Sequence, residues 1–252
     1  MKYGRSYNFS ADAAPLPEEV LEELAAEVMN YHGSGLSVLE LADDADDAGQ
    51  LFRQTEAALR KLVRLPAGTA VRFLRDDAAV SALPGARDLS ADFLSGPLAL
   101  EEGEAVYART RRSLGVDGLT VALVPAGALA EDLPRPTCWA VYCLGKVLNR
   151  LNKLGGLDAA GAASREKAGL LRDFLAKSRL FSKVGEERPL HTVSFTAPTA
   201  AQNDAVLAAA RGAHLLNLEG PGCLRAALSV NLPREGAEAL TDFLRKFEAA
   251  AK

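Results

Sequence analysis

The segment NFSADAAPLPEEVLEELAAEVMNYHGSGLSVLEL, residues 8–41, holds the clearest local pattern of the chain. Its first part is rich in Asn, Ser, Asp and Pro, which favour turns and extended backbone. Residues 17–31 predict a helix, because Pro17 suits a first turn and acidic side chains crowd the positive end of the helix dipole. Apolar residues also recur there at helical spacing. The glycines of HGSG at 32–35 end this helix.

Helix and strand patterns continue outward from this segment to the end of the chain. The further helices are expected at residues 51–65, 136–154, 158–178, 201–211 and 234–250. The strands are expected at residues 70–74, 104–110, 119–125, 180–184, 190–197, 214–218 and 223–231. Residues 75–100 show little pattern. The order after residue 158 is typical of a small α+β domain.

Composition excludes several classes of protein. The chain has 252 residues, enough for one large domain or two small ones. A net charge of −4 and a pI of about 5.5 give no reason to expect nucleic-acid binding. No apolar run is long enough to span a bilayer, so a soluble protein is expected. Three cysteines are too few for a disulfide framework, which favours a reducing compartment. The expected location is therefore cytoplasmic or, for a processed mature chain, mitochondrial or plastid.

Three parts of the chain together resemble the phosphoserine aminotransferase family, whose members are class V, fold-type I enzymes dependent on pyridoxal phosphate (PLP). The parts are residues 8–41, residues 88–97 with 107–125, and residues 135–157 with 218–248. The resemblance implies an α/β PLP-transferase fold of type I, with a shortened sheet in the large domain and a small α+β C-terminal domain. The family chain is longer by roughly one hundred residues. The missing part falls between Asp76-Asp77 and Asp88, so the chain resembles a truncated and degenerate member.

The resemblance also implies a domain plan. Residues 1–16 form an N-terminal segment that packs with the small domain. Residues 17–155 form the truncated large domain, formerly the PLP-binding one, and include the interdomain helix 136–154. Residues 156–252 form the small α+β domain.

The decisive position is the one where the family carries its Schiff-base lysine. The resemblance places Arg112 there, at the family's spacing from Asp88. A guanidinium stays protonated and cannot serve as the amine nucleophile. No lysine occurs between Lys61 and Lys146 that could replace it nearby. Asp88 falls where the family pairs an acid with the pyridine nitrogen; a surface or turn aspartate is the other interpretation.

Other family positions have also changed. Asp76 and Asp77 stand where the phosphate-binding loop is expected, and carboxylates repel a phosphate. Asp44 and Glu219 stand at positions where the family has substrate-binding arginines. Leu133-Pro134 replaces a family Asn-Thr, while Arg225 is retained and is expected to be structural. We therefore expect no catalytic, PLP-binding or substrate-binding residues and no cofactor.

Further clusters each leave two interpretations open. The acidic run could hold a cation or form a solvated loop. The arginines at the end of strand 104–110 could bind an anion or an acidic partner, or could be a solvated strand end. The histidines and the helical cysteines lack the spacing of a metal site, so none is expected. The residues concerned are Asp43, Asp44, Asp46, Asp47, Arg109, Arg111, Arg112, His32, His191, His214, Cys138 and Cys143.

The expected function follows from these losses. It is a non-catalytic pseudoenzyme that serves as a structural or accessory subunit of a larger protein assembly. One alternative is a regulatory partner that pairs with an active phosphoserine aminotransferase in a family-like dimer. A further alternative is a residual PLP-dependent transaminase of serine biosynthesis. In the first two cases the partners are proteins, with no nucleic acid and no membrane span.

Overall fold

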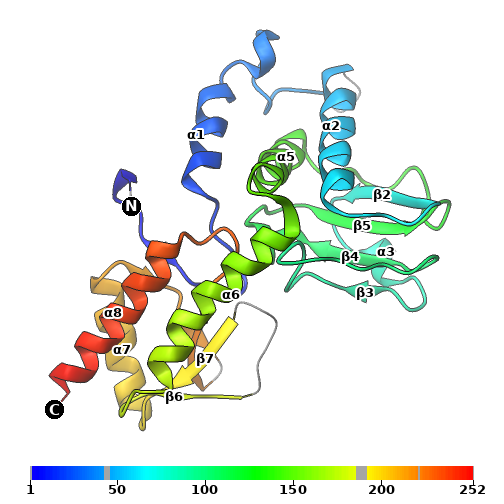
Figure 1. Ribbon diagram of the computed structural model, residues 1–252. Helices are drawn as coiled ribbons and strands as arrows, with labels where there is room; N and C mark the ends of the chain where they lie inside the picture. Colours follow the sequence, from blue (N-terminus) through cyan, green and yellow to red (C-terminus); the bar gives the residue numbers. More distant parts are fainter. Residues whose placement is uncertain (1, 43–45, 186–191, 221, 252) are drawn as a thin grey trace. The chain divides into compact units, whose positions relative to one another are not determined.

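The computed structural model describes residues 2–42, 46–185, 192–220 and 222–251 (Figure 1). The protein is of the α/β class. It divides into two compact units, Leu16–Ala160 and a second unit that combines Met1–Pro15 with Gly161–Lys252. Within the described residues, no helix has both the length and the apolar character needed to cross a membrane.

The first unit contains a four-stranded sheet in the order β2-β5-β4-β3. The strands are β2 (Thr69–Leu74), β5 (Thr120–Pro125), β4 (Val106–Arg109) and β3 (Arg87–Asp88). β5 pairs antiparallel with both β2 and β4, and the short edge strand β3 runs parallel to β4. Five consecutive β5 residues are buried, as expected for a strand with neighbours on both sides and packing on both faces.

Two long helices lie side by side on one side of this sheet, α2 (Asp46–Leu62) and α5 (Cys138–Lys153) (Figure 1). They approach closely where α5 carries Gly145: a Cβ there would lie 2.9 Å from Thr55 Oγ1 of α2. The Thr137 side chain caps α5 by accepting a hydrogen bond of 3.3 Å from the backbone N–H of Ala140. The shorter helices of the unit are α1 (Glu18–Glu27), α3 (Ala78–Ser81), α4 (Thr110–Leu114) and a 3₁₀ turn, η2 (Tyr31–Gly33).

The second unit is built on an antiparallel sheet in the order β6-β7-β10-β9. These strands are β6 (Ser182–Lys183), β7 (Thr192–Thr196), β10 (Cys223–Ala227) and β9 (Glu219–Gly220). A parallel pair, β1 (Tyr7–Asn8) with β8 (Leu215–Leu216), ties the N-terminal segment to this unit. A 3₁₀ turn, η1 (Lys2–Gly4), precedes β1.

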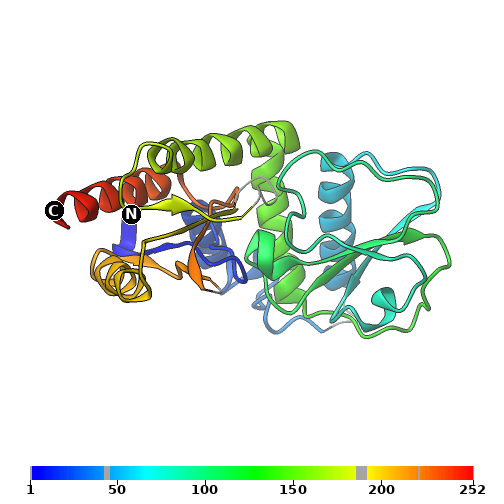
Figure 2. The ribbon, with the colours of Figure 1, turned by 90° about the horizontal axis from the view of Figure 1, so that it is seen from below.

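Three helices contribute to one core of the second unit: α6 (Gly156–Leu175), which begins before the unit does, α7 (Ala200–Gly212) and α8 (Arg234–Ala250). α6 and α8 run side by side, and an ion pair between Glu166 and Arg234 joins them (Figures 1 and 2). The buried ammonium of Lys167 donates to the carbonyl oxygens of Ser229 and Leu232 at 2.5 and 2.6 Å. These bonds hold the segment between β10 and α8 against α6.

Two expected helix boundaries are wrong. The helix expected over 17–31 ends at Glu27, and His32 adopts a left-handed φ of 47° within η2. The helix expected over 51–65 begins at Asp46, so Asp46 and Asp47 form its first turn instead of a solvated loop. Carboxylates are stabilised there by the helix dipole. Asp43 and Asp44 of the same acidic run lie outside the described residues.

The remaining differences concern short elements. β10 ends at Ala227, before the expected strand end at 231, and β8 covers only two residues of the expected strand 214–218. Residues 75–100, which show little pattern, contain α3 and β3. Elements of two to four residues are too short to show a helix or strand period.

Candidate functional site

The first unit brings Asp77, Asp88 and Arg109 together at the β3–β4 edge of its sheet. Asp88 is paired in register with Tyr107 of β4, and Arg109 ends that strand two residues later. Asp77 lies at the N-cap position of α3. We call Asp77, Asp88, Ser90 and Arg109 the Asp88 cluster.

Asp88 is hydrogen-bonded on both carboxylate oxygens. Its Oδ1 accepts from the backbone N–H of Ser90 at 2.7 Å and from the Ser90 hydroxyl. Its Oδ2 accepts from the Arg109 guanidinium at 3.0 Å. Burial by itself raises the pKa of Asp88, but the Ser90 and Arg109 hydrogen bonds outweigh it and the pKa lies below its usual value. Asp88 is therefore held ionised by its own chain.

Arg109 bridges two carboxylates. Its Nε lies 3.8 Å from Asp77 Oδ2, while its terminal nitrogen binds Asp88. Its backbone N–H donates to Ser90 Oγ at 2.8 Å. The hydrogen bond to Asp88 raises the pKa of Arg109 further. Arg109 is thus an exposed side chain at the end of β4 that is engaged with carboxylates of its own chain.

Arg112 lies in α4, one turn beyond the end of β4. Thr110, fully buried, anchors this helix: its hydroxyl donates to the carbonyls of Val116 and Leu119 at 2.7 and 3.0 Å. Gly115 ends α4 in the left-handed conformation, with φ 78°. Burial raises the pKa of Asp92, and attraction to the Arg112 guanidinium partly opposes that rise. Arg112 is half-buried, and its charge is felt by this neighbouring carboxylate.

The nearest lysines before and after Arg112 in the sequence, Lys61 and Lys146, lie on other elements. Lys61 lies in the last turn of α2. Lys146 of α5 binds Glu27 of α1, with Nζ 2.8 Å from Oε2, and lies 3.7 Å from Glu23. Neither belongs to the elements that carry Asp88 and Arg112.

The other predicted site residues lie apart from this cluster or make local contacts. Asp76 accepts from the backbone N–H of Ala78 at 3.0 Å, at the start of α3. In the second unit, Glu219 forms an ion pair with Arg211 at 2.5 Å, which lowers the pKa of Glu219. Arg225 lies 3.9 Å from Asp12 in the same unit. Asp44 lies outside the described residues.

The described residues contain no group of three or more His, Cys, Asp or Glu side chains placed to hold a metal ion. His214 contacts the Ser6 hydroxyl through Nδ1 at 3.2 Å, and His191 lies outside the described residues. Cys138 and Cys143 are both buried, and neither forms a disulfide bond. Burial raises the pKa of the Cys143 thiol to about 12, so it is a neutral core group at ordinary pH.

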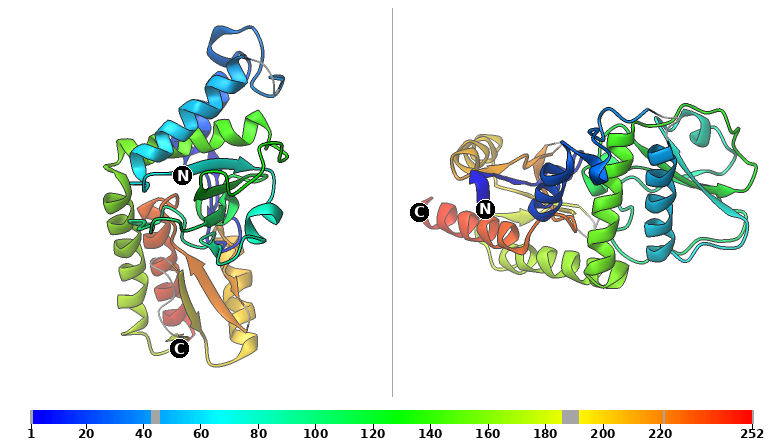
Figure 3. Two further views of the ribbon diagram at one scale, coloured as in Figure 1. Left: turned by 90° about the vertical axis from the view of Figure 1, so that its right-hand side faces the viewer. Right: turned by 90° about the horizontal axis from the view of Figure 1, so that it is seen from above.

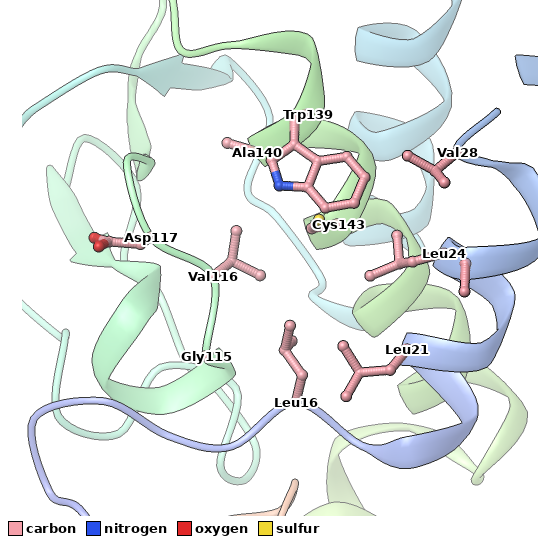
Figure 4. A pocket seen from close by; sticks show the side chains of 11 residues that line it. Leu16, Leu21, Leu24, Val28, Gly115, Val116, Asp117, Trp139, Ala140 and Cys143 are labelled. Carbon is pink, nitrogen blue, oxygen red and sulfur yellow. The ribbon is translucent and has the colours of Figure 1, made fainter. Parts of the chain in front are cut away.

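Sequence reasoning missed a pocket of about 510 Å³ in the first unit (Figure 4). It lies between α1, the segment after α4 and the start of α5. The side chains of Leu16, Leu21, Val116 and Trp139 point into it, whereas the Asp117 carboxylate points away. We call it the α1 pocket; its lining comprises Leu16, Leu21, Leu24, Ala25, Val28, Gly115, Val116, Asp117, Trp139, Ala140 and Cys143. The spacing of Leu21, Leu24 and Val28 predicts an apolar helix face, but spacing does not show whether other side chains cover that face.

No model of a protein family matches the chain. Among curated proteins, the phosphoserine aminotransferase of Lactiplantibacillus plantarum is 26% identical over an alignment 351 residues long, which covers 96% of this chain and 98% of the relative. The phosphoserine aminotransferase of Bordetella pertussis is 24% identical over 370 residues, covering 97% of this chain and 98% of the relative.

Solved structures show the same fold. Phosphoserine aminotransferase from Bacillus circulans subsp. alkalophilus superposes with a TM-score of 0.90 at 21% identity, over 98% of this chain and 99% of that one. The PLP-bound phosphoserine aminotransferase of Trichomonas vaginalis gives a TM-score of 0.84 at 18% identity, over 96% of this chain and 100% of that one. With relatives that align along almost the entire chain and a fold in common with their solved structures, the protein is a member of the phosphoserine aminotransferase family and has the fold-type I PLP-transferase architecture.

Proposed function

We propose that this family member is a non-catalytic, phosphoserine-aminotransferase-like protein that serves as an accessory subunit of a larger protein assembly. The observation that carries the proposal is Arg112 in α4, the position that the resemblance assigns to the Schiff-base lysine. A guanidinium remains protonated at every physiological pH and has no free amine lone pair with which to form an imine. The relatives named above are aminotransferases, so the proposal is one of lost activity on a retained fold.

The surroundings of Arg112 support the same conclusion. Residues 62–145 contain no lysine, and all four strands of the first unit's sheet lie within this range. No strand of that sheet therefore carries a side-chain amine. Lys146, the next lysine along the chain, is bound to Glu27 at 2.8 Å. An amine that serves a covalent cofactor must be placed within reach of its reacting carbon.

The residues present also fit PLP poorly as a non-covalent ligand. An acid that pairs with the pyridine nitrogen needs an oxygen able to accept that N–H; Asp88 Oδ1 already accepts twice from Ser90, so such a donor would have to share Oδ2 with Arg109. A phosphate site needs backbone N–H groups or cations. Asp76 and Asp77, at the positions expected for that site, are carboxylates, and Arg109, the cation nearest to Asp77, also binds Asp88. We therefore derive no catalytic step through the cofactor.

Chain length supports a shortened cofactor domain. The alignment with the L. plantarum enzyme extends over 351 residues, whereas this chain has 252 residues in all. The difference amounts to roughly the hundred residues that the sequence comparison with the family predicts to be missing.

The sheet of the first unit supports a role in an assembly. Its edge strand β3 is only two residues long, but the opposite edge strand, β2, spans six residues. Sheet edges present unpaired backbone groups that proteins keep short or cover with other chains. A shortened domain also buries less apolar surface of its own, which makes a partner surface more valuable.

A transamination assay tests the proposal. The purified chain is incubated with PLP, phosphoserine and a 2-oxo acid, and amino-group transfer is compared with PLP in buffer and with an active phosphoserine aminotransferase. We expect the rate with this chain to equal that of free PLP. Transfer above that background, saturable in phosphoserine, would contradict the proposal.

A further inference from the structure

Ion pairs hold α1 against α5 along one side of α1. In the right view of Figure 3, α5 (green) lies between α1 (dark blue) and α2 (lighter blue). Glu19 of α1 binds Arg150 of α5, and Glu27 lies 2.8 Å from Lys146 Nζ. The residues of α1 that line the α1 pocket occupy another side of the helix: Leu21, Leu24, Ala25 and Val28. The ion pairs therefore fix the position of α1 while a different, apolar side of the helix borders the pocket.

The size of the α1 pocket suits a small molecule. Its volume of about 510 Å³ lies within the range of about 300–1,000 Å³ that is typical of small-molecule sites. α1, the segment after α4 and the start of α5 form its walls, and all of them belong to the first unit. A stable protein interface takes about 20–30 residues from each partner, whereas eleven residues line this pocket. The pocket by itself is therefore better matched to a small molecule than to a protein surface.

The lining of the pocket presents no charge to an occupant. Among the described residues that line it, Asp117 is the only one with a charged side chain. Its carboxylate points away from the pocket (Figure 4) and lies 3.2 Å from the Arg111 guanidinium. A charged group inside the pocket would lose its hydration without gaining a counter-charge. The pocket therefore favours an uncharged occupant.

One polar group faces the pocket among the apolar side chains. Trp139 of α5 is half-buried, and its indole nitrogen is turned toward the side where Val116 lies (Figure 4). This N–H donates a hydrogen bond to none of the described residues. Indole N–H groups that lose contact with water usually find an acceptor. An occupant that displaces water from the pocket would have to supply that acceptor.

We propose that the α1 pocket binds a small, uncharged, largely apolar molecule that carries a carbonyl or similar oxygen as acceptor for the Trp139 indole N–H. The apolar side chains of the three walls would cover most of the molecule, and the single hydrogen bond would fix its orientation. This inference goes beyond the proposed accessory role and does not rest on it, because the pocket shares no residue with the Asp88 cluster or with Arg112.

The test is a titration of the full chain with a dimethylaminonaphthalene ethyl ketone, an uncharged probe whose emission shifts to the blue in apolar surroundings. One matched probe lacks the ketone, and another carries a carboxylate in its place. Trp139 is the only tryptophan of the chain, so energy transfer from it reports a probe bound beside it. We expect saturable binding of the ketone, weaker binding of the ketone-free probe, and binding of the carboxylate weakened by about tenfold or more.

A bulky side chain at the pocket wall tests the location. Ala25 and Ala26 are neighbouring exposed residues of α1, but only Ala25 lines the pocket. Ala25→Phe is expected to weaken ketone binding by about tenfold or more, because its ring takes up pocket volume. Ala26→Phe is the matched control, since it makes the same substitution in the same helix and has the same cost in helix propensity. Its affinity for the ketone is expected to be unchanged.

Trp139→Phe tests the hydrogen bond, because it keeps an aromatic ring in the pocket wall and removes the N–H. Ketone binding, followed by the emission of the probe itself, is expected to weaken by about two- to tenfold, as the loss of one hydrogen bond does. Binding of the ketone-free probe is expected to change little. Equal weakening of both probes would contradict the role of the indole N–H.

Four further results would each overturn the proposal. The first is the absence of saturable binding by either uncharged probe, and the second is equal binding of the ketone and the carboxylate. The third is equal weakening of ketone binding by Ala25→Phe and Ala26→Phe. The fourth is self-association, seen by light scattering, that Ala25→Phe abolishes and Ala26→Phe does not, while the ketone fails to bind; that result would assign the pocket to contact with a second copy of the chain.

Discussion

Arg109 determines the electrostatic state of the β3–β4 edge. Its guanidinium is 3.0 Å from Asp88 and 3.8 Å from Asp77, so one cation serves two carboxylates. The pKa of Tyr107, which is buried beside them, is raised by burial and by the charges of Asp88 and Asp77. Asp88, the carboxylate that accepts the most hydrogen bonds in this cluster, therefore already forms an ion pair with Arg109 of the adjacent strand β4.

Replacing this base tests the cluster. Arg109→Ala is expected to raise the pKa of Asp88, followed by carboxyl carbon NMR, because the ionised form loses its cation. Since the pKa of Asp88 lies below its unfolded value, its contribution to stability is present at neutral pH and disappears as the pH falls through the folded-state pKa. For this half-exposed pair we expect a loss of about 0.5 kcal/mol at neutral pH.

Arg111→Ala is the matched control, because Arg111 pairs with Asp117 at 3.2 Å and both side chains are largely exposed. It is expected to leave the Asp88 titration unchanged. An Asp88 pKa that does not move in Arg109→Ala would show that Ser90 alone sets it.

Restoring an amine at position 112 tests whether the missing lysine alone accounts for the expected absence of PLP binding. Arg112→Lys alone is expected not to give saturable PLP binding, because Asp76 and Asp77 repel the phosphate and Arg109 still occupies Asp88. The readout is the visible absorption of PLP titrated into the variant and into the unchanged protein. A saturable aldimine band in the variant alone would mean that the remaining residues can hold the cofactor and that position 112 is the single lesion.

At the scale of elements, the close approach of α2 and α5 depends on Gly145, which has no side chain. Gly145→Ala would place a Cβ 2.9 Å from Thr55 Oγ1, so we expect a loss of about 1–3 kcal/mol from overpacking, measured by urea denaturation. Gly169→Ala is the control, since a Cβ at that position in α6 meets nothing within 4 Å. It is expected to stabilise by about 0.5–1 kcal/mol through helix propensity.

A second substitution checks the cause of the first. Thr55→Ala removes the hydroxyl that the new Cβ would strike, so Gly145→Ala is expected to cost less in the Thr55→Ala background. Equal costs in both backgrounds would contradict the steric explanation.

Lys167 has a corresponding role in the second unit. Lys167→Met leaves the carbonyls of Ser229 and Leu232 without the ammonium donor that lies 2.5 and 2.6 Å away, and we expect a loss of about 1–3 kcal/mol. The exposed Lys177→Met in the same unit is expected to change stability by less than about 0.5 kcal/mol. Equal effects of the two substitutions would show that the buried hydrogen bonds add nothing.

The elements that the sequence predicted well are those with several turns or a complete apolar run. α5 and α8 show helical spacing over four turns, and β5 is an unbroken apolar strand, so all three were expected within a few residues of their bounds. α3, β3 and α4 were missed because each is too short for a period and lies among glycines and prolines. The early start of α2 was missed because its first turn is acidic, a pattern shared by loops and by helix N-termini.

The candidate site was predictable only in part. The sequence named Asp88, Arg109 and Arg112, but their pairing depends on the β3–β4 register, which no local pattern shows. The α1 pocket depends on three segments that are distant in the chain, α1, residues 115–117 and α5, so only the fold brings it into view.

At the scale of the whole molecule, the fold is shared with phosphoserine aminotransferases, and the proposed loss of their reaction concerns the site alone. The chain superposes with a TM-score of 0.90 on a solved phosphoserine aminotransferase. Fold alone does not determine activity, which depends on the side chains of the site. In this chain the α4 position that the family resemblance assigns to the lysine carries Arg112, and Asp88 is hydrogen-bonded to Ser90 and Arg109 of the same chain.

The most direct test of this proposed loss is reduction of the PLP mixture with borohydride, followed by mass spectrometry of the intact chain. An internal aldimine would be trapped as a permanent adduct of one PLP at a single lysine, whereas nonspecific adducts scatter over exposed lysines and scale with PLP concentration. We expect only the scattered, non-saturating adducts. One stoichiometric adduct at a single lysine, formed at low PLP concentration, would contradict the central claim that this family member has lost its Schiff base.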